Sequence, residues 1–485
     1  MVSHLLNTDD RLTAKKTKIV CTLGPKTFSI DAITKLRKMG MDVARLNGAQ
    51  GDLEWHKQAI QLVRAVDPLI SILVDIPGRK IRTTELDAPY PVKIGDLVIF
   101  TTITLPKDPH KIPVNYAKLH EDLKEGDHIL VDDGTLFFTV VKIDGHDIHC
   151  QAENNGQVKS FKGVNVPYVK VNSPVVSERD KAILEFCQKE GVDYIGLSFV
   201  ENAGDVYQVR GVLSGSDVGI IAKIENSRGI ENLEEILAVS DAIMIDRGDL
   251  GAETSVEQIG LLQKKVVHIA TQQGVPVIIA TEMLNSMIEN PMPTKAEVND
   301  ITNAILDGAS AVMLSGESAV GKYPFESVKL LSDVIRQTEV YLNQMGNPLK
   351  VGDIKDTSNT IGRAVYDITR SLNIDKIVSI ASTGYSAKMI ARYRGQAKII
   401  IAINTIEKAR KMNLIWGSEV VVIPFTLDPS STEHIMVVIQ ALIDQKLLLD
   451  DDKFILVSAK HEFYTTKMNS LEVHSVASLK KLTHW

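Results

Sequence analysis

The stretch "IIAKIENSRGIENLEEILAVSDAIMIDRGDLG" (residues 220–251) holds two short apolar runs separated by a segment of helical period. Lys223 and Glu225 stand at the end of the first run, and an Asp-Arg-Gly-Asp sequence ends the second. Continuous apolar runs of this length are typical of strands that are buried on both faces of a parallel sheet. Charged residues at the tips of such strands need partners or a chemical role. The stretch therefore predicts both a parallel sheet and a site at its edge.

The same alternation extends over most of the first 345 residues. Amphipathic segments with apolar residues at helical spacing, many with a glycine near the end, separate successive β-branched runs. The runs cover residues 17–24, 41–47, 71–76, 192–200, 218–225, 242–248, 276–283 and 311–318. Eight strands, each followed by a helix, are the count of a closed (β/α)₈ TIM barrel. We therefore predict an α/β fold built on such a barrel.

The segment between the third and fourth apolar runs has a different residue pattern. Residues 87–171 contain prolines, alternating apolar runs and little helical period, which predicts an inserted all-β domain that could cover the active face of the barrel. The barrel then comprises residues 1–86 and 172–345. Renewed alternation of strands and helices predicts a C-terminal α/β regulatory domain over residues 346–485.

Composition excludes several classes of protein. The net charge is -7 and no basic stripe is present, so the sequence indicates no nucleic-acid partner. We find no signal peptide and no apolar run long enough to cross a bilayer, and we expect a cytoplasmic protein without a membrane partner. Cys21, Cys150 and Cys187 lie far apart and are odd in number, which argues against a disulfide framework. A nucleophilic role stays open for Cys21, although packing in a strand is the more common use.

Polar residues gather at the predicted strand ends, where barrels of this class carry their chemistry. Any one of them could form a rim salt bridge, but together they favour a site. Glu225 and Asp249 can hold a hydrated Mg²⁺ ion, and Lys223 suits negative charge on a phosphoryl group or an enolate. Lys223 and Glu225 could instead simply pair with each other. The set comprises Arg45, Asn47, Asp75, Ser198, Lys223, Glu225, Arg247, Asp249, Thr281, Ser315 and Glu317.

Several motifs then identify a family. "TKIVCTLGP" (17–25), "AKIEN" (222–226), "RGDLG" (247–251) and the long run from Thr281 to Pro324 occur in the order seen in pyruvate kinases. The chain resembles that family over nearly its whole length. The resemblance implies phosphoryl transfer between phosphoenolpyruvate and ADP in glycolysis, giving pyruvate and ATP. It also implies Mg²⁺ or Mn²⁺ as cofactor, a C-terminal regulatory domain with a sugar-phosphate or nucleotide effector, and a homotetramer.

The resemblance also implies roles for individual residues. Glu225 and Asp249 would bind Mg²⁺, Lys223 would stabilise the phosphoryl group in flight, and Thr281 would lie beside the carbon that takes the proton. Substrate would be held by Arg45, Lys223, Arg247, Gly248, Asp249 and Thr281. The nucleotide would meet Asn47, Arg82 and Lys162, the last in the "KGVNVP" motif of the inserted domain.

Two motifs depart from the family pattern around its monovalent-cation site. Ala49 replaces a serine that helps bind the cation, Ile76 removes a further oxygen ligand, and Lys80 stands where K⁺-dependent members carry glutamate. Beside them, Gln50 replaces a histidine near the nucleotide phosphates. We therefore hypothesise that Lys80 supplies the charge of the missing ion and that K⁺ is not required. The alternative is that Lys80 is merely solvated on the rim. Asn47, Asp75 and Lys80 would be the remnant of the cation site.

Three acids, Glu201, Asp246 and Glu282, are also unusual, and they should weaken binding of anionic substrates unless they pair, for example with Arg79. In the C-terminal domain, Ser382, Thr383, Gly384 and Ser386 resemble an effector loop, with a plain helix N-cap as the alternative. Two rival functions stay open. The chain could be a catalytically weak homologue kept for binding, or another barrel enzyme such as an aldolase.

Overall fold

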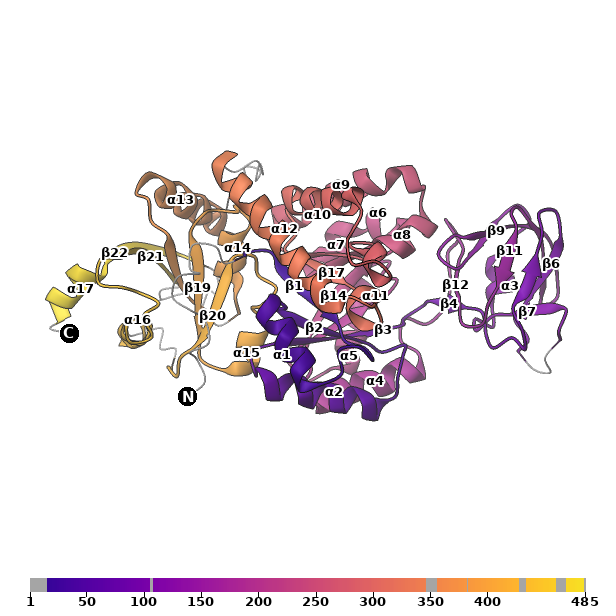
Figure 1. Cartoon of the computed structure of the whole chain (residues 1–485), viewed down its shortest axis with the longest axis horizontal. Coiled ribbons are helices and arrows are strands. Elements are labelled where there is room, and N and C mark those ends of the chain that lie inside the picture. Colours follow the sequence, from indigo (N-terminus) through magenta and orange to yellow (C-terminus); the bar gives the residue numbers. More distant parts are fainter. Residues whose placement is uncertain are drawn as a thin grey trace.

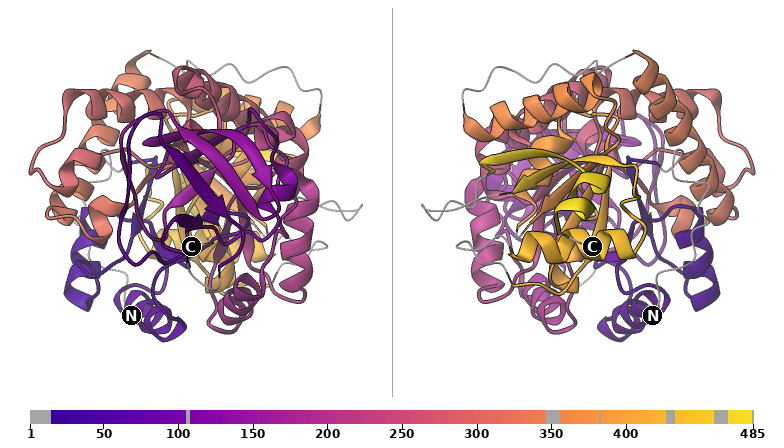
Figure 2. Two further views of the ribbon diagram at one scale, coloured as in Figure 1. Left: turned by 90° about the vertical axis from the view of Figure 1, so that its right-hand side faces the viewer. Right: turned by 90° about the vertical axis from the view of Figure 1, so that its left-hand side faces the viewer.

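The computed structural model describes residues 15–104, 108–345, 356–381, 383–426, 433–458 and 468–483. Three bodies lie in a row along the long axis, with the barrel in the middle, the all-β domain at one end and the C-terminal domain at the other (Figure 1). In the end-on views the β domain stands in front of the barrel from one side and the C-terminal domain from the other (Figure 2).

The central body is a closed barrel of eight parallel strands, in the order β1-β17-β16-β15-β14-β13-β3-β2, as predicted. The strands are β1 (Lys18–Thr22), β2 (Val43–Asn47), β3 (Ser71–Ile76), β13 (Tyr194–Leu197), β14 (Gly219–Ile224), β15 (Ala242–Asp246), β16 (Val277–Ala280) and β17 (Ala311–Leu314). The surrounding helices are α1 (Ile30–Met39), α2 (Leu53–Val66), α4 (Glu178–Lys189), α5 (Ala203–Val212), α6 (Ser227–Glu231), α7 (Leu233–Val239), α8 (Arg247–Glu253), α9 (Ile259–Gln273), α10 (Lys295–Asp307), α11 (Gly316–Ala319) and α12 (Pro324–Met345), with 3₁₀ turns at Val256–Gln258 and Asn285–Ile288.

Side chains alternate along each barrel strand between the helices and the barrel interior. The interior core includes Val20, Val43, Leu73, Ile221 and Met244, one layer below the carboxyl ends of their strands. The next inward positions, two residues further on, are polar. This alternation is why a ring of charged groups sits at one mouth of an otherwise apolar barrel.

The inserted domain is a seven-stranded sheet in the order β4-β12-β8-β9-β10-β6-β7, with the separate pair β5 and β11. Its first strand, β4, precedes the boundary expected at residue 87, because Ile81 already pairs with Val164 of β12. Phe100 and Phe138 meet edge to face in its core, with ring centroids 5.1 Å apart. The elements are β4 (Ile81–Arg82), β5 (Tyr90–Val92), β6 (Leu97–Thr101), β7 (Lys111–Pro113), α3 (Leu119–Asp122), β8 (His128–Val131), β9 (Leu136–Asp144), β10 (Asp147–Ala152), β11 (Gly156–Val158) and β12 (Gly163–Asn165).

The C-terminal domain is a five-stranded sheet in the order β20-β19-β18-β21-β22. Its last strand runs antiparallel to β21 and was not expected from the sequence. Leu414 of this domain enters the apolar core inside the barrel and closes its amino-terminal end. The elements are α13 (Thr357–Ser371), β18 (Lys376–Ile380), α14 (Tyr385–Ala391), β19 (Lys398–Ile403), α15 (Ile406–Arg410), β20 (Ser418–Val422), α16 (Glu433–Asp444), β21 (Lys453–Ser458), β22 (Ser470–Ser475) and α17 (Val476–Thr483). Among the helices of the described ranges, none is both long and apolar enough to cross a bilayer.

Candidate active site

Strand register brings the charged ends of β14 and β15 together. Lys223 pairs with Met244, and Ile224 pairs with Ile245, so the next residues on the two strands are Glu225 and Asp246. Residues two apart on a strand point to the same side. Lys223 and Glu225 therefore both face the barrel mouth, and Asp246 joins them there.

Lys223 is the centre of this group. Its ammonium nitrogen lies 2.7 Å from Glu225 Oε1, 3.0 Å from Asp246 Oδ2 and 3.5 Å from Asp75 Oδ2. It also donates to Ser198 Oγ at 3.3 Å. Burial alone would lower the pKa of Lys223, but the carboxylates of Glu225, Asp246 and Asp75 raise it well above its ordinary value. The side chain is therefore a fixed positive charge at the mouth of the barrel.

The neighbouring carboxylates have the donor chemistry of a divalent-cation site. Glu225, Asp246 and Asp249 are all buried, and one ligand oxygen from each lies within 4.8 Å of the others. Phe199 N–H donates to Glu225 Oε2 at 2.6 Å, and Glu225 Oε1 faces Lys223 Nζ at 2.7 Å. Burial raises the pKa of Glu225 to about 8, against the opposing effect of Lys223. A hard cation such as Mg²⁺ matches these oxygens and would favour their ionised forms.

Lys80 reaches into the same group from the segment between β3 and β4. Its ammonium nitrogen donates to both carboxylate oxygens of Asp249, at 2.6 Å and 2.7 Å. The nitrogen also lies 5.7 Å from the centroid of the Phe199 ring, and the side chain passes Gly163 of the inserted domain. Lys80 is therefore held inside the site and is not a solvated residue on its rim.

Arg45 and Asp75 form a second ion pair at the mouth. Arg45 donates to Asp75 Oδ2 from Nε at 2.9 Å and from Nη2 at 2.8 Å, and its Nη1 donates to Thr22 Oγ1 at 2.9 Å. Asn47 Oδ1 accepts the backbone N–H of Ala49 at 3.1 Å. Asp75 Oδ2 and Asn47 Oδ1 are thus engaged by the protein itself, whereas the buried Asp75 Oδ1 accepts no hydrogen bond.

Thr281 lies beside the first turn of α8 in a strained conformation. Its φ of 67° is rare for a β-branched residue. Arg247 holds this conformation by donating to Thr281 O at 2.7 Å, and its other arm donates to Asp300 at 2.6 Å. Thr281 Oγ1 accepts Gly248 N–H at 2.9 Å. Arg247 therefore acts on the backbone of Thr281, and the Thr281 hydroxyl, which accepts from the Gly248 amide, donates to Ala280 O at 2.6 Å.

The inserted domain meets the barrel beside this site. Asn165 Nδ2 donates to the buried carboxylate of Glu253 at 2.9 Å. The two residues expected to approach the nucleotide, Arg82 and Lys162, make their contacts within the inserted domain: Arg82 donates to Phe161 O at 3.2 Å, and Lys162 pairs with Asp132 at 2.7 Å. Both cations lie on the domain that covers the site, but neither joins the cluster around Lys223.

The unusual acids find different environments. Glu201 pairs with Arg79 at 3.1 Å and with Arg228 at 3.2 Å, so the pairing suggested for Arg79 is present. Glu282 is exposed. Asp246 is buried against Lys223, and sequence reasoning missed its place in the site. The available signal was its register, since it ends its strand at the same level as Glu225.

The cysteines show no reactive environment. Cys21, Cys150 and Cys187 are buried and free, and burial raises the pKa of each thiol. A thiol that stays protonated is a poor nucleophile. The structure therefore gives no support to a catalytic role for Cys21.

The expected effector loop is only partly described, because Ser382 lies outside the described residues. Gly384 is the N-cap of α14 with a φ of 75°, and a Cβ there would lie 2.2 Å from Met412 Sδ. Thr383 is exposed and Ser386 is buried. Close packing therefore accounts for the glycine, and no side chain caps this helix.

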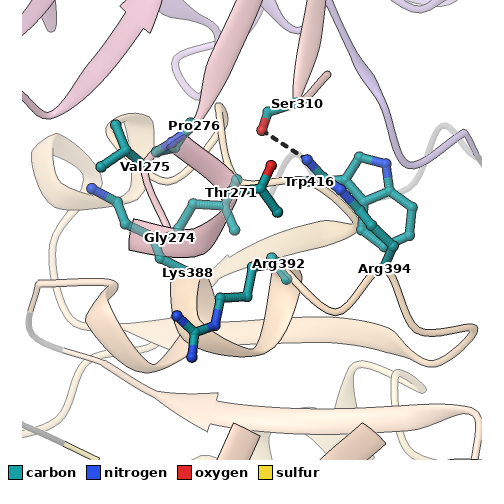
Figure 3. A pocket seen from close by; sticks show the side chains of 11 residues that line it. Thr271, Gly274, Val275, Pro276, Ser310, Lys388, Arg392, Arg394 and Trp416 are labelled. Carbon is teal, nitrogen blue, oxygen red and sulfur yellow. Dashed lines mark hydrogen bonds between the residues drawn. The ribbon is translucent and has the colours of Figure 1, made fainter. Parts of the chain in front are cut away.

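A small cavity lies far from this site, between the barrel floor and the C-terminal domain (Figure 3). Its volume of about 20 Å³ is enough for about one water molecule. Lys388 donates to Asp241 O at 3.2 Å, Arg392 to Gln272 O at 2.8 Å and Arg394 to Ser310 Oγ at 3.3 Å. Cations near the last turn of a helix such as α9 interact favourably with its free carbonyl groups. These side chains thus join the two domains.

Comparisons with known proteins match both large domains. The family description "Pyruvate kinase, barrel domain" matches residues 14–328, and "Pyruvate kinase, alpha/beta domain" matches residues 359–474. A pyruvate kinase of Geobacillus stearothermophilus is 36% identical over 96% of this chain and 81% of its own length. One from Staphylococcus aureus is 39% identical over 84% of this chain and 72% of its own length. The crystal structure of a pyruvate kinase from Cryptosporidium parvum is 32% identical, with a TM-score of 0.85, over 97% of this chain and 98% of that one.

Proposed function

Because this chain belongs to the pyruvate kinase family, we propose that it is a phosphotransferase that moves a phosphoryl group from phosphoenolpyruvate to ADP, giving pyruvate and ATP. The observation that carries the proposal is the buried ammonium of Lys223, surrounded by Glu225, Asp246 and Asp75 at the mouth of the barrel. A fixed positive charge beside a cation site is what phosphoryl transfer needs, because negative charge spreads over the moving group.

The reaction exchanges one phosphorus–oxygen bond for another. The bond between phosphorus and the enol oxygen breaks, a bond to a terminal phosphate oxygen of ADP forms, and the enolate takes a proton at its methylene carbon. Lys223 stabilises charge on the phosphoryl group, and Thr281 lies beside the carbon that is protonated. Mg²⁺ or Mn²⁺, held by Glu225 and Asp249, supplies charge neutralisation and orientation when bound.

Substrate binding falls to groups around this centre. Arg45 and the Gly248 amide contact the anionic groups of phosphoenolpyruvate. Arg82 and Lys162 of the inserted domain, with Asn47 of the barrel, contact the nucleotide phosphates. Support for the lid residues comes from their position on the domain that meets the barrel through the Asn165 and Glu253 hydrogen bond. Closure of that domain would bring them to the nucleotide.

We further propose that the enzyme does not require K⁺. Lys80 places an ammonium against Asp249, and the two positions that would offer oxygen ligands are Ala49 and Ile76. Asn47 Oδ1 accepts a backbone N–H, and Asp75 is bound to Arg45. A monovalent ion would therefore find a fixed positive charge already in place, and two of the remaining oxygens, Asn47 Oδ1 and Asp75 Oδ2, already bonded.

Family membership supports three further proposals about the protein. These are assembly as a homotetramer, a cytoplasmic location, and control by a sugar-phosphate or nucleotide effector near residues 383–386. The preferred nucleotide and the effector are left to experiment.

The decisive assay couples pyruvate formation from phosphoenolpyruvate and ADP to lactate dehydrogenase, with purified protein and Mg²⁺. Wild-type protein should turn over, and Lys223→Ala should lose at least a thousandfold in kcat. Lys118→Ala, which removes an exposed lysine of the inserted domain, is the matched control and should keep full activity. No turnover by wild-type protein would favour the binding-protein rival. Cleavage of an aldol substrate in its place would favour the aldolase rival.

A further inference from the structure

We propose that Asp246 is a third carboxylate ligand of the divalent cation, beside Glu225 and Asp249. The proposal rests on the proposed function, because it assumes that the cation of phosphoryl transfer binds at this cluster. It adds a residue that the sequence analysis treated only as an unexplained extra charge.

Geometry places Asp246 in the cation cluster. It ends β15 at the same level as Glu225, the residue that follows β14, and one of its oxygens lies within 4.8 Å of ligand oxygens of Glu225 and Asp249. Its side chain is buried, unlike that of the exposed Glu282. Two oxygens on opposite sides of one Mg²⁺ ion lie at most about 4.2 Å apart, so a small inward movement of these side chains would let all three bind one ion.

The balance of charged side chains at the barrel mouth also favours a bound cation. Buried charges without compensation are costly, and charged groups in proteins are therefore paired or bind metal ions. Among the described residues, the cluster sets the carboxylates of Asp75, Glu225, Asp246 and Asp249 against the cations Arg45, Lys80 and Lys223. When all four carboxylates are ionised, one negative charge is left over, and a bound divalent cation would offset it.

Lys80 explains why a third ligand is useful in this chain. Its ammonium occupies both oxygens of Asp249, at 2.6 Å and 2.7 Å. A divalent ion bound to Asp249 is attracted less strongly by that carboxylate, because Lys80 is paired with it as well. The carboxylate of Asp246 supplies a further anionic oxygen ligand to the ion. The two departures from the family pattern therefore compensate each other in charge, one adding a cation and the other an anion.

A role through Lys223 alone is the competing explanation. Asp246 Oδ2 lies 3.0 Å from Lys223 Nζ, so the carboxylate could serve only to position that ammonium. Lys223 already has Glu225 at 2.7 Å and Asp75 at 3.5 Å. The two roles predict different hydration of a bound ion. When a metal ligand is removed, a water molecule takes its place on the ion. When only a counter-charge of Lys223 is removed, the number of water ligands on the ion does not change.

The experiment measures Mn²⁺ binding to the full-length protein without substrates, by the electron paramagnetic resonance signal of free Mn²⁺ and by the proton relaxivity of the bound ion. Asp246→Ala and the nearly isosteric Asp246→Asn should each raise the Kd for Mn²⁺ at least tenfold. Asp246→Ala should also raise the relaxivity of bound Mn²⁺, because a water molecule enters the vacated position. Glu257→Gln removes an exposed acid just after α8 and should change neither quantity.

Two results would overturn the proposal. One is a Kd for Mn²⁺ in both Asp246 variants within twofold of the wild-type value. The other is a raised Kd with unchanged relaxivity, which would assign Asp246 to charge balance around Lys223. Circular dichroism of each variant tests folding, and Asp246→Asn keeps the packing if Asp246→Ala does not fold. Because the titration contains no substrate, Mn²⁺ binding without turnover would contradict the proposed function and leave the ligand assignment standing.

Discussion

The ammonium nitrogen of Lys80 lies 2.6 Å and 2.7 Å from the two carboxylate oxygens of Asp249, across the junction between the barrel and its inserted domain. A residue from the segment that leads into the lid therefore neutralises a carboxylate on the first turn of α8. Two of the predictions that follow concern how charge is balanced around this junction.

Lys80→Ala should lower kcat/KM for phosphoenolpyruvate at least tenfold, because the site loses its fixed positive charge. K⁺ should restore little of that rate, since Ala49 and Ile76 offer no oxygen to a monovalent ion. The measurement is the coupled assay in Na⁺ and in K⁺ buffer, with Lys118→Ala as control. Wild-type activity that rises several-fold in K⁺ would contradict the proposal.

Glu253→Gln should stabilise the protein at pH 8 and leave it unchanged at pH 4.5. Burial raises the pKa of Glu253 from 4.5 to about 7, although the hydrogen bond from Asn165 opposes the shift. The folded chain thus holds a proton that the unfolded chain loses, and the stability contributed by protonated Glu253 is lost as the pH rises from 4.5 through 7. The loss is on the order of 3 kcal/mol.

Glutamine keeps an oxygen that can accept from Asn165 and carries no charge at either pH. Thermal unfolding at pH 4.5 and pH 8 measures the effect as a Tm higher by a few degrees at pH 8 only. Glu257→Gln should leave Tm unchanged at both values, because Glu257 is exposed. An equal Tm for wild-type protein and Glu253→Gln at pH 8 would show that the pKa of Glu253 is not raised in the folded protein.

Gly196→Ala should disrupt the barrel mouth. A Cβ at this position would lie 2.1 Å from Asp75 Oδ1, so Asp75 must move and release Arg45. We expect a KM for phosphoenolpyruvate at least tenfold higher, together with a lower Tm. Gly211→Ala on α5 has no atom within 4 Å of the new Cβ, and there alanine should stabilise by about 0.4 to 1 kcal/mol. Unchanged kinetics of Gly196→Ala would mean that Asp75 does not position Arg45.

Leu414→Ala should destabilise the barrel although Leu414 belongs to the C-terminal domain. Its side chain is 1% exposed inside the apolar core of the barrel, and truncating a leucine in such a core costs about 2 to 5 kcal/mol. Chemical denaturation measures the loss. Leu449→Ala, at a residue 41% exposed, should cost less than about 1 kcal/mol. A Leu414 variant as stable as Leu449→Ala would show that the barrel floor closes without the C-terminal domain.

The sequence by itself determined the order of the elements. Period-2 and period-3.6 patterns are local, so the eight strands from Lys18 to Leu314 and the helices between them could be predicted, as could the change of texture in the inserted segment. β22 could not be predicted, because its side chains are mostly half-exposed and it pairs with β21 across residues 459–469. Pairing of that kind is set by tertiary contacts and not by the strand's own pattern.

The residue types of the site were also readable from the sequence, since Lys223, Glu225 and Asp249 stand at strand ends, where barrels place their chemistry. Only the tertiary structure determined which charged side chains lie together and form ion pairs. Strand register put Asp246 beside Glu225, and closure of the barrel brought Asp75 of β3 to Lys223 of β14. The segment leading to the lid carried Lys80 to Asp249, which lies 169 residues away in the chain. Ion pairs between such distant residues depend on how the elements pack, and no local pattern in the sequence encodes them.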